Sequence, residues 1–147
     1  MAAMARIIED QDGIADVVRR MKRVAVLGMK TEAQRDQAAF YVPAGLMHDG
    51  IEIVPVPVYY PEVTQILGLP VYRRVADVPG PIDVVDVFRR SHRLVDHVDD
   101  LLKKKPAVVW FQSDIENDDV AQQLVNGGID VIQDSCLLVM HRLYRGR

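Results

Sequence analysis

The sequence predicts an α/β fold of three layers, in which a parallel sheet of about five strands carries helices on both faces. Short and almost wholly apolar runs, typical of strands buried on both faces, recur along the chain. Amphipathic stretches of helical periodicity separate these runs, and the links between them are short. Strands that alternate with helices form right-handed βαβ units, so we expect a doubly wound, Rossmann-like order of the strands.

The composition restricts the kinds of protein and partner. The 147 residues suffice for one domain with its own core, and we expect a single domain over residues 1–147, with residues 1–22 as an N-terminal helical extension. A net charge of −3 gives no general attraction to nucleic acid or to anionic lipid. The lone Cys136 cannot form an intramolecular disulfide, and no apolar run approaches the roughly 20 residues of a membrane span. Because Met1 to Asp10 also lack a signal-peptide pattern, we expect a cytoplasmic protein.

The first half of the chain is predicted to begin with a short helix that has Asp12 as its N-cap. Pro43 falls within the next helical stretch, and we expect it to kink that helix or to end its first half. The elements predicted after the first helix are a strand at 24–28, a helix at 33–48, a strand at 51–56, a short helix at 61–67 and a minor strand at 71–72.

The second half repeats the alternation of strand and helix. Ser91 is expected to cap one helix, which Pro106 stops, and Ser113 to Asn117 are expected to open another. Asp86 interrupts a buried strand, where we expect it to anchor a neighbouring loop, whereas Trp110 belongs to the core. The predicted strands lie at 82–88, 107–112 and 129–132, and a short, finally basic helix ends the chain.

The carboxyl ends of the strands are the predicted ligand crevice. Gly28 allows a sharp turn and a close approach to the backbone, and the loop and helix after it present free N–H groups to an anion. A dinucleotide site would need two more glycines after Gly28, and an acidic residue where Val56 and Pro57 stand. NAD binding is therefore disfavoured. The sequence also contains no phosphate-binding Gly-x-x-x-x-Gly-Lys loop and no spacing typical of a metal site.

Several stretches together resemble the stand-alone CoA-binding domain proteins, which are similar to the amino-terminal domain of succinyl-CoA synthetase α subunits. The resemblance runs from Arg23 to His141, and the block from Val75 to Arg90 is its most specific part. The stretches that carry it are VAVLG, the following loop with Arg35, VPVPVYY, LPVY, VADVPGPIDVVDVFRR, VVWFQ and the terminal DSC with His141.

The resemblance implies coenzyme A as the ligand and a role for each loop. The first loop would hold the pyrophosphate, the second would line the adenine side, and the third would close the crevice: Gly28, Met29, Lys30 and Arg35; Pro57, Val58, Tyr59 and Tyr60; and Phe88, Arg89 and Arg90. Arginine offers a planar fork for phosphate oxygens, and tyrosine offers a flat face for a purine.

The chain departs from the family pattern at three places. Lys30-Thr31 replaces a serine and proline, Pro57 replaces an asparagine, and Asp114 replaces a glycine after the Trp-x-Gln strand. We expect Asp114 to be a helix N-cap whose carboxylate occupies the position that a phosphate would use.

We therefore expect a non-catalytic protein that binds CoA or acyl-CoA, because no nucleophile with a base and an orienting group can be assembled from the sequence. Two alternatives stay open. One is a protein-interaction domain that kept the fold and lost the ligand. The other is an enzyme acting on a CoA thioester or another nucleotide, with Cys136, Asp134 or His141 in the chemistry. A homodimer or a protein partner is compatible with each of these.

Overall fold

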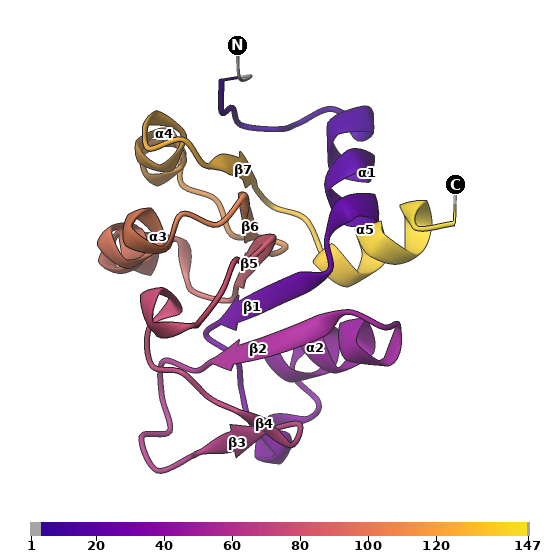
Figure 1. Ribbon diagram of the computed structural model, residues 1–147, viewed down its shortest axis with the longest axis vertical. Coiled ribbons are helices and arrows are strands. Elements are labelled where there is room, and N and C mark those ends of the chain that lie inside the picture. Colours follow the sequence, from indigo (N-terminus) through magenta and orange to yellow (C-terminus); the bar gives the residue numbers. More distant parts are fainter. Residues whose placement is uncertain (1–3, 147) are drawn as a thin grey trace.

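The computed structural model describes residues 4–146 and contains one five-stranded, wholly parallel sheet (Figure 1). In spatial order its strands are β2 (Glu52–Val56), β1 (Arg23–Leu27), β5 (Val84–Val87), β6 (Val108–Phe111) and β7 (Asp130–Ile132). The chain adds β2 on one side of β1 and then crosses over to add β5 on the other side. The α/β, doubly wound prediction is confirmed, and the strand order reverses between β1 and β5.

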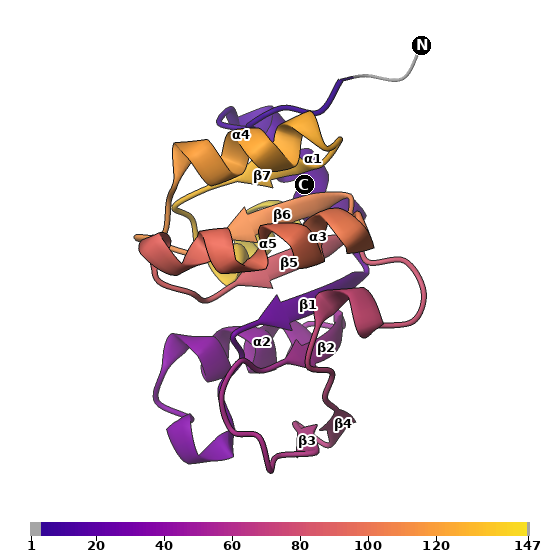
Figure 2. The ribbon, with the colours of Figure 1, turned by 90° about the vertical axis from the view of Figure 1, so that its left-hand side faces the viewer.

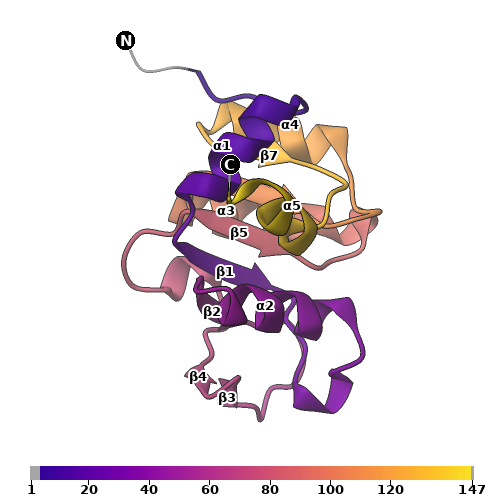
Figure 3. The ribbon, with the colours of Figure 1, turned by 90° about the vertical axis from the view of Figure 1, so that its right-hand side faces the viewer.

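Helices cover both faces of this sheet. One face carries α1 (Gln11–Arg20), α2 (Ala38–His48) and α5 (Leu137–Tyr144), and Figure 3 shows this side of the molecule. The opposite face, seen in Figure 2, carries α3 (Val98–Lys104) and α4 (Asp118–Asn126). Alternate residues of β1 belong to the two cores: Val24 and Val26 pack on the first side, and Ala25 and Leu27 on the second. This division explains why the central strands read as continuous apolar runs.

Several predicted helix starts are wrong, by two residues for α1 and by more than one turn for α2 and α3. Asp10, not Asp12, caps α1, since its carboxylate accepts a bond of 2.9 Å from the Gly13 N–H. Thr31 caps a 3₁₀ segment, Glu32–Gln34, and Ser91 is the first residue of another, Ser91–His97. The α-helices α2 and α3 begin only after these segments. Asn117, the last residue of the predicted opening segment, caps α4. In α1, α2 and α3 a polar residue that favours a helix start lies at a 3₁₀ turn or lies off the true cap position.

Pro43 lies inside α2 without ending it. A proline has no N–H, so the carbonyl oxygen of Ala39, four residues earlier, loses its helical partner. That oxygen instead accepts a hydrogen bond of 3.1 Å from the Lys30 N–H. The predicted helix break does not occur, and a hydrogen bond joins the loop after β1 to the first turn of α2.

The segment after β2 forms a hairpin rather than the predicted helix at 61–67. The hairpin pairs β3 (Gln65–Ile66) with β4 (Leu69–Pro70), and a 3₁₀ turn, Val75–Asp77, follows it. Leu67 and Gly68 form its turn with φ angles of 55° and 71°, a geometry suited to tight hairpins. In the N-terminal segment, Ile7 forms an isolated parallel β-bridge with Val131 of β7. Within residues 4–146, no helix combines the length and apolarity needed to cross a bilayer.

Candidate functional site

The carboxyl ends of β1 and β5 lie side by side, as the sequence predicts. Leu27 pairs with Val87, and the next residues, Gly28 and Phe88, stand at adjacent strand ends. A Cβ atom on Gly28 would lie 2.3 Å from the Phe88 carbonyl oxygen, so only glycine permits this approach. The strand order reverses at this same point, which is where open α/β sheets bind their ligands.

A crevice of about 450 Å³ opens above these strand ends. The loop after β1, the start of α2, and the loops after β5 and β6 all contribute to its wall. The lining residues are Lys30, Gln37, Ala38, Ala39, Phe88, Arg89, Arg90, Ser91, Asp114 and Ile115. Three of them are cationic and one is anionic, which favours an anionic ligand.

The start of α2 is the first anion-binding element of the crevice. Its N-cap, Gln37, makes no side-chain cap and instead accepts a hydrogen bond from the Lys30 ammonium group. The N–H groups of Ala38 and Ala39 find no acceptor among residues 4–146. Uncapped N–H groups at a helix start carry a partial positive charge, so this end of the crevice suits a phosphate group.

Arg89 is the second anion-binding element. Its side chain is only 8% exposed, and its Nε donates to His97 Nε2 at 3.0 Å while its Nη1 donates to the Tyr59 hydroxyl at 3.2 Å. The guanidinium carbon also lies 5.4 Å from the centre of the Tyr59 ring. No carboxylate within residues 4–146 forms an ion pair with it. A buried cation without a counter-ion is costly, and an anionic ligand would offset that cost.

The pKa shifts of Tyr59 and His97 are consistent with their hydrogen bonds to Arg89. The hydrogen bond from Arg89, followed by its positive charge, lowers the pKa of Tyr59. Burial, and then the charge of Arg89, lowers the pKa of His97 below its usual value. His97 is therefore neutral at physiological pH, and its Nε2 is available as the acceptor for Arg89.

The loop after β2 reaches the site through Tyr59 alone. Tyr59 is 60% exposed, and its ring stands edge-on to that of Tyr60 with the ring centres 6.3 Å apart. The guanidinium of Arg73 donates to four carbonyl oxygens of this loop, at Tyr59, Tyr60, Pro61 and Val63, over 2.6–3.2 Å. One exposed arginine thereby fixes the path of the segment that presents Tyr59 to Arg89.

Comparison with known proteins identifies the family of the chain. The family model described as CoA binding domain matches residues 22–142. The chain belongs to the CoA binding domain family. The uncharacterized protein YneT of Bacillus subtilis is 33% identical over 128 residues, which cover 87% of this chain and 91% of that protein.

Two solved structures show how this family member relates to other proteins. A protein from Thermus thermophilus shares 30% identity and a TM-score of 0.83, over 92% of this chain and 99% of that one. The acetyl-coenzyme A synthetase 1 of Ca. Korarchaeum cryptofilum, solved with phosphate and ADP, aligns with 80% of this chain at 19% identity and a TM-score of 0.66. The aligned part is 27% of the synthetase chain, and at this identity the likeness concerns the fold.

The structure brings only some of the predicted site residues of this CoA binding domain into the crevice. Lys30, Phe88, Arg89 and Arg90 line it, and Gly28 lies beneath Arg89. Tyr59 contacts Arg89 without lining the crevice. The other five lie elsewhere: Met29 is 1% exposed in the core, Arg35 donates to the Glu32 carbonyl oxygen outside the lining, Pro57 is buried, Val58 lines a separate hollow with His97, and Tyr60 packs against Tyr59.

The sequence predicts an anion-binding helix start after Gly28 but puts it near residue 33 rather than at Ala38, and it does not single out His97. A helix start at Gln37 lacks the usual capping residues, and the preceding Thr31 and Gln34 form a capping box on the 3₁₀ turn instead. The hydrogen bond between His97 and Arg89 depends on how the 3₁₀ segment Ser91–His97 folds back over the strand end. No local signal in the sequence encodes that contact.

Asp114 lines the crevice and is not a helix cap, which corrects the prediction. Its N–H donates to Asp134 Oδ1 at 2.7 Å, and α4 begins only at Asp118. The φ angle of Asp114 is 67°, in the left-handed region that favours glycine. This angle gives a physical reason for the glycine that the family pattern has here. Aspartate tolerates the conformation better than most residues, and it adds a negative charge to the crevice.

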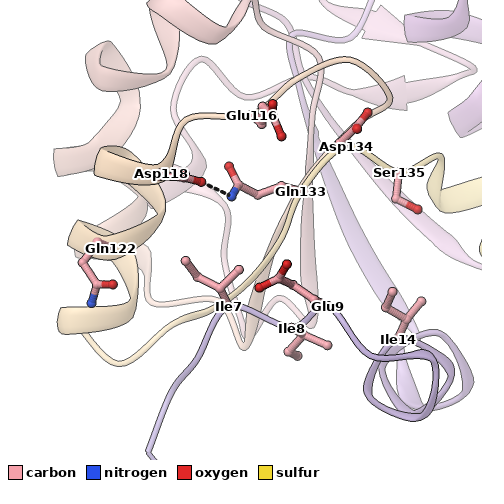
Figure 4. A pocket seen from close by; sticks show the side chains of 10 residues that line it. All are labelled: Ile7, Ile8, Glu9, Ile14, Glu116, Asp118, Gln122, Gln133, Asp134 and Ser135. Carbon is pink, nitrogen blue, oxygen red and sulfur yellow. Dashed lines mark hydrogen bonds between the residues drawn. The ribbon is translucent and has the colours of Figure 1, made fainter.

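A larger cavity of about 740 Å³ lies at the β7 edge of the sheet, between the N-terminal segment and α4 (Figure 4). Four acids line it, Glu9, Glu116, Asp118 and Asp134, and Asp118 accepts a hydrogen bond from the Gln133 amide at 3.1 Å. No cation is among its lining residues. This wall repels phosphates, so the crevice at the β1 and β5 ends is the better site for an anionic cofactor.

Proposed function

We propose that this CoA binding domain binds coenzyme A, or an acyl-CoA, in the crevice between β1 and β5, as a non-catalytic binding protein. The observation that carries the proposal is Arg89, a buried guanidinium with no carboxylate partner among residues 4–146, which lines the same crevice as the uncapped start of α2. Both groups suit the pyrophosphate of CoA. Arg90 and Lys30 add positive charge along the same wall.

The residues weighed for an enzyme do not assemble into a catalytic group. His141 is 6% exposed on α5, and it lies beside charged groups at the ends of α2 and α5, namely Asp49, Arg142 and Arg145. Cys136 is the residue before α5 and packs into the core, while Asp134 accepts the Asp114 N–H. None of these three side chains forms a hydrogen bond to another, and none lines the crevice.

We expect CoA to stabilise the folded protein and NAD at the same concentration to leave it unchanged. A ligand at a hundredfold excess over its Kd adds about 2.7 kcal/mol to the free energy of unfolding. For a domain of about 150 residues this corresponds to a rise in Tm of roughly 5 to 10 °C. Thermal unfolding with each ligand measures the effect.

Arg89→Gln is the variant that links this stabilisation to the crevice. Losing a charge-assisted bond to phosphate should weaken CoA binding by about tenfold or more, or about 1.5–3 kcal/mol. The ligand-free variant should keep its stability, because the substitution also removes an uncompensated buried charge. Arg20→Gln, on the exposed side of α1, is the matched control and should bind CoA as before.

Equal Tm shifts with CoA and NAD, or an Arg89→Gln protein that binds CoA normally, would contradict the proposal. A chain that binds neither ligand would instead be a domain that kept the fold for protein interaction.

Asp114 is expected to weaken CoA binding in this chain. Its carboxylate shares the crevice with Arg89 and Lys30, and salt at physiological strength screens charges only beyond about 8 Å. We expect Asp114→Gly to tighten CoA binding, most clearly at low salt. Because glycine adopts the φ of 67° without strain, the variant should be at least as stable as the parent.

Asp114→Asn separates the two effects of this substitution. Asparagine also tolerates the left-handed conformation but carries no charge. Calorimetric titration of CoA into the three proteins at two salt concentrations should therefore show tighter binding in both variants. If affinity rises only in Asp114→Gly, the backbone and not the charge is responsible, and if neither variant binds more tightly, the carboxylate does not oppose the ligand.

A further inference from the structure

His97 and Arg89 form a hydrogen-bonded pair in which Arg89 is buried and His97 is partly buried. The hydrogen bond between them runs from Arg89 Nε to His97 Nε2, and His97 lines a separate hollow with Leu27 and Val58. His97 is not among the residues that line the crevice, so we expect it to act on a ligand there through the guanidinium of Arg89.

We infer that His97 is a positioning residue whose neutral ring holds the Arg89 guanidinium toward the crevice, so that acidification releases Arg89 and weakens anion binding. The inference rests on the CoA binding proposed above and adds its regulation by pH. An arginine side chain can only donate hydrogen bonds, so the bond from Arg89 Nε–H requires an unprotonated nitrogen on His97 as its acceptor. Protonation puts a hydrogen on that nitrogen and places two cations 3.0 Å apart.

The surroundings of His97 offer little compensation for that second charge. Of the acids near it, Asp96 pairs with Arg93 at 3.1 Å, and Asp100 accepts the N–H groups of Val75 and Ala76 at 2.8 and 2.9 Å. The remaining charged groups around its hollow are one acid on α3 and three cations, namely Asp99, Arg73, Arg74 and Lys103. Burial and Arg89 outweigh these acids and lower the pKa of His97. The acceptor is thus intact at neutral pH and is lost as the pH falls through a value below that of an ordinary histidine.

The test uses dephospho-CoA, whose pyrophosphate diester keeps the same charge as the pH falls below neutrality, so that a loss of affinity on acidification does not come from the ligand. We expect its affinity to fall about tenfold as His97 becomes protonated, which is the loss of one charge-assisted bond. His97→Leu should bind more weakly at neutral pH, and His97→Gln, whose amide oxygen can accept the Nε–H, should recover affinity relative to His97→Leu. Neither variant should show the fall at acidic pH. His48→Gln, an exposed histidine at the end of α2, is the matched control and should keep it.

The change in the pKa of His97 on ligand binding is a second measurement. The inference and a simple attraction between charges predict opposite signs for this change. If the ligand requires neutral His97, binding must lower the pKa of His97, whereas an anion acting only by its charge would raise that pKa. NMR titration of the His97 ring with and without dephospho-CoA decides between them. An affinity that stays constant or rises on acidification, or a raised pKa in the complex, would overturn the inference.

A third measurement keeps this inference separate from the proposed function. In the ligand-free protein the Arg89 Nε–H resonance should shift with the titration of His97, and this shift should vanish in His97→Gln. If the protein binds no CoA at all, the proposed function fails while this result still reports on the pair. If the Nε–H resonance ignores the titration, His97 does not hold Arg89, whatever the protein binds.

Discussion

Replacing Gly28 with alanine is expected to lower the free energy of unfolding by at least about 2 kcal/mol and to abolish the crevice in its present form. The φ angle of Gly28 is 85°, which costs an alanine about 1–2 kcal/mol before any contact is considered. The added Cβ would also meet the Phe88 carbonyl oxygen at 2.3 Å and the Arg89 Cδ at 3.3 Å. Phe88 directly follows β5, and its N–H is bonded to the Leu27 carbonyl oxygen at 2.9 Å, so relieving the clash requires a shift of the loop that carries Arg89.

Gly50→Ala and Gly128→Ala are the matched controls for this prediction. Both glycines have positive φ angles, 97° and 90°, but an added Cβ on either meets no atom within 4 Å. Urea unfolding of the three variants separates the strain in φ, common to all, from the clash that is specific to Gly28. We expect Gly28→Ala to be the least stable and the only one that loses CoA-dependent stabilisation. Equal losses in the three variants would mean that the two strand ends can separate at little cost.

The sheet was predictable because its strands are encoded locally. All four residues of β6 are apolar, and so are three of the four in β5, the exception being Asp86. Strand and helix patterns alternate along the chain. Together these features permit few topologies other than a parallel, doubly wound one. The helix starts were less predictable. Thr31 and Ser91 have the chemistry of caps, but the chain forms 3₁₀ segments at these residues, and α2 and α3 begin only where they can pack on the sheet. Packing, rather than capping preference, decided those positions.

The candidate site was predictable to the extent that it follows from topology. Residues after β1 and β5 meet at the reversal of strand order, and this rule alone places Gly28, Lys30 and Arg89 together. The burial of Arg89 was not predictable in the same way, because it depends on Tyr59 from one loop and His97 from another. Arg35 has the same residue type, but it caps a local carbonyl beside a 3₁₀ turn. Residue type identified the candidates, and tertiary contacts separated them.

Asp86 is a polar residue at the centre of the sheet that the site does not use. It is fully buried on β5 between its strand neighbours Val26 and Trp110, and neither carboxylate oxygen has a hydrogen-bond partner among residues 4–146. The prediction that it anchors a loop is wrong. Asp83 does so instead, since its Oδ2 accepts the N–H groups of Lys22 and Arg23 at 2.8 and 2.9 Å.

Asp86→Asn is expected to make the protein more stable at neutral pH, by about 1–3 kcal/mol, and to flatten the dependence of its stability on pH. Burial raises the pKa of Asp86 well above its usual value. Above about pH 4 the unfolded chain ionises this carboxyl while the folded protein keeps it protonated. The folded state then binds more protons than the unfolded state, so stability falls as the pH rises from about 4 toward the raised pKa. Asparagine cannot ionise, and it removes this loss.

Asp83→Asn is the matched control, because the same substitution three residues earlier should have the opposite effect. There the carboxylate accepts two backbone N–H bonds, and an amide oxygen accepts them less strongly, so stability should fall. Free energies of unfolding measured in urea between about pH 5 and 8 compare the three proteins. Asp86→Val, which also removes the unsatisfied oxygens, should stabilise at every pH in this range. An Asp86→Asn protein that is weaker than its parent at neutral pH would show that the folded protein stabilises the ionised carboxylate, and the buried acid would then be charged.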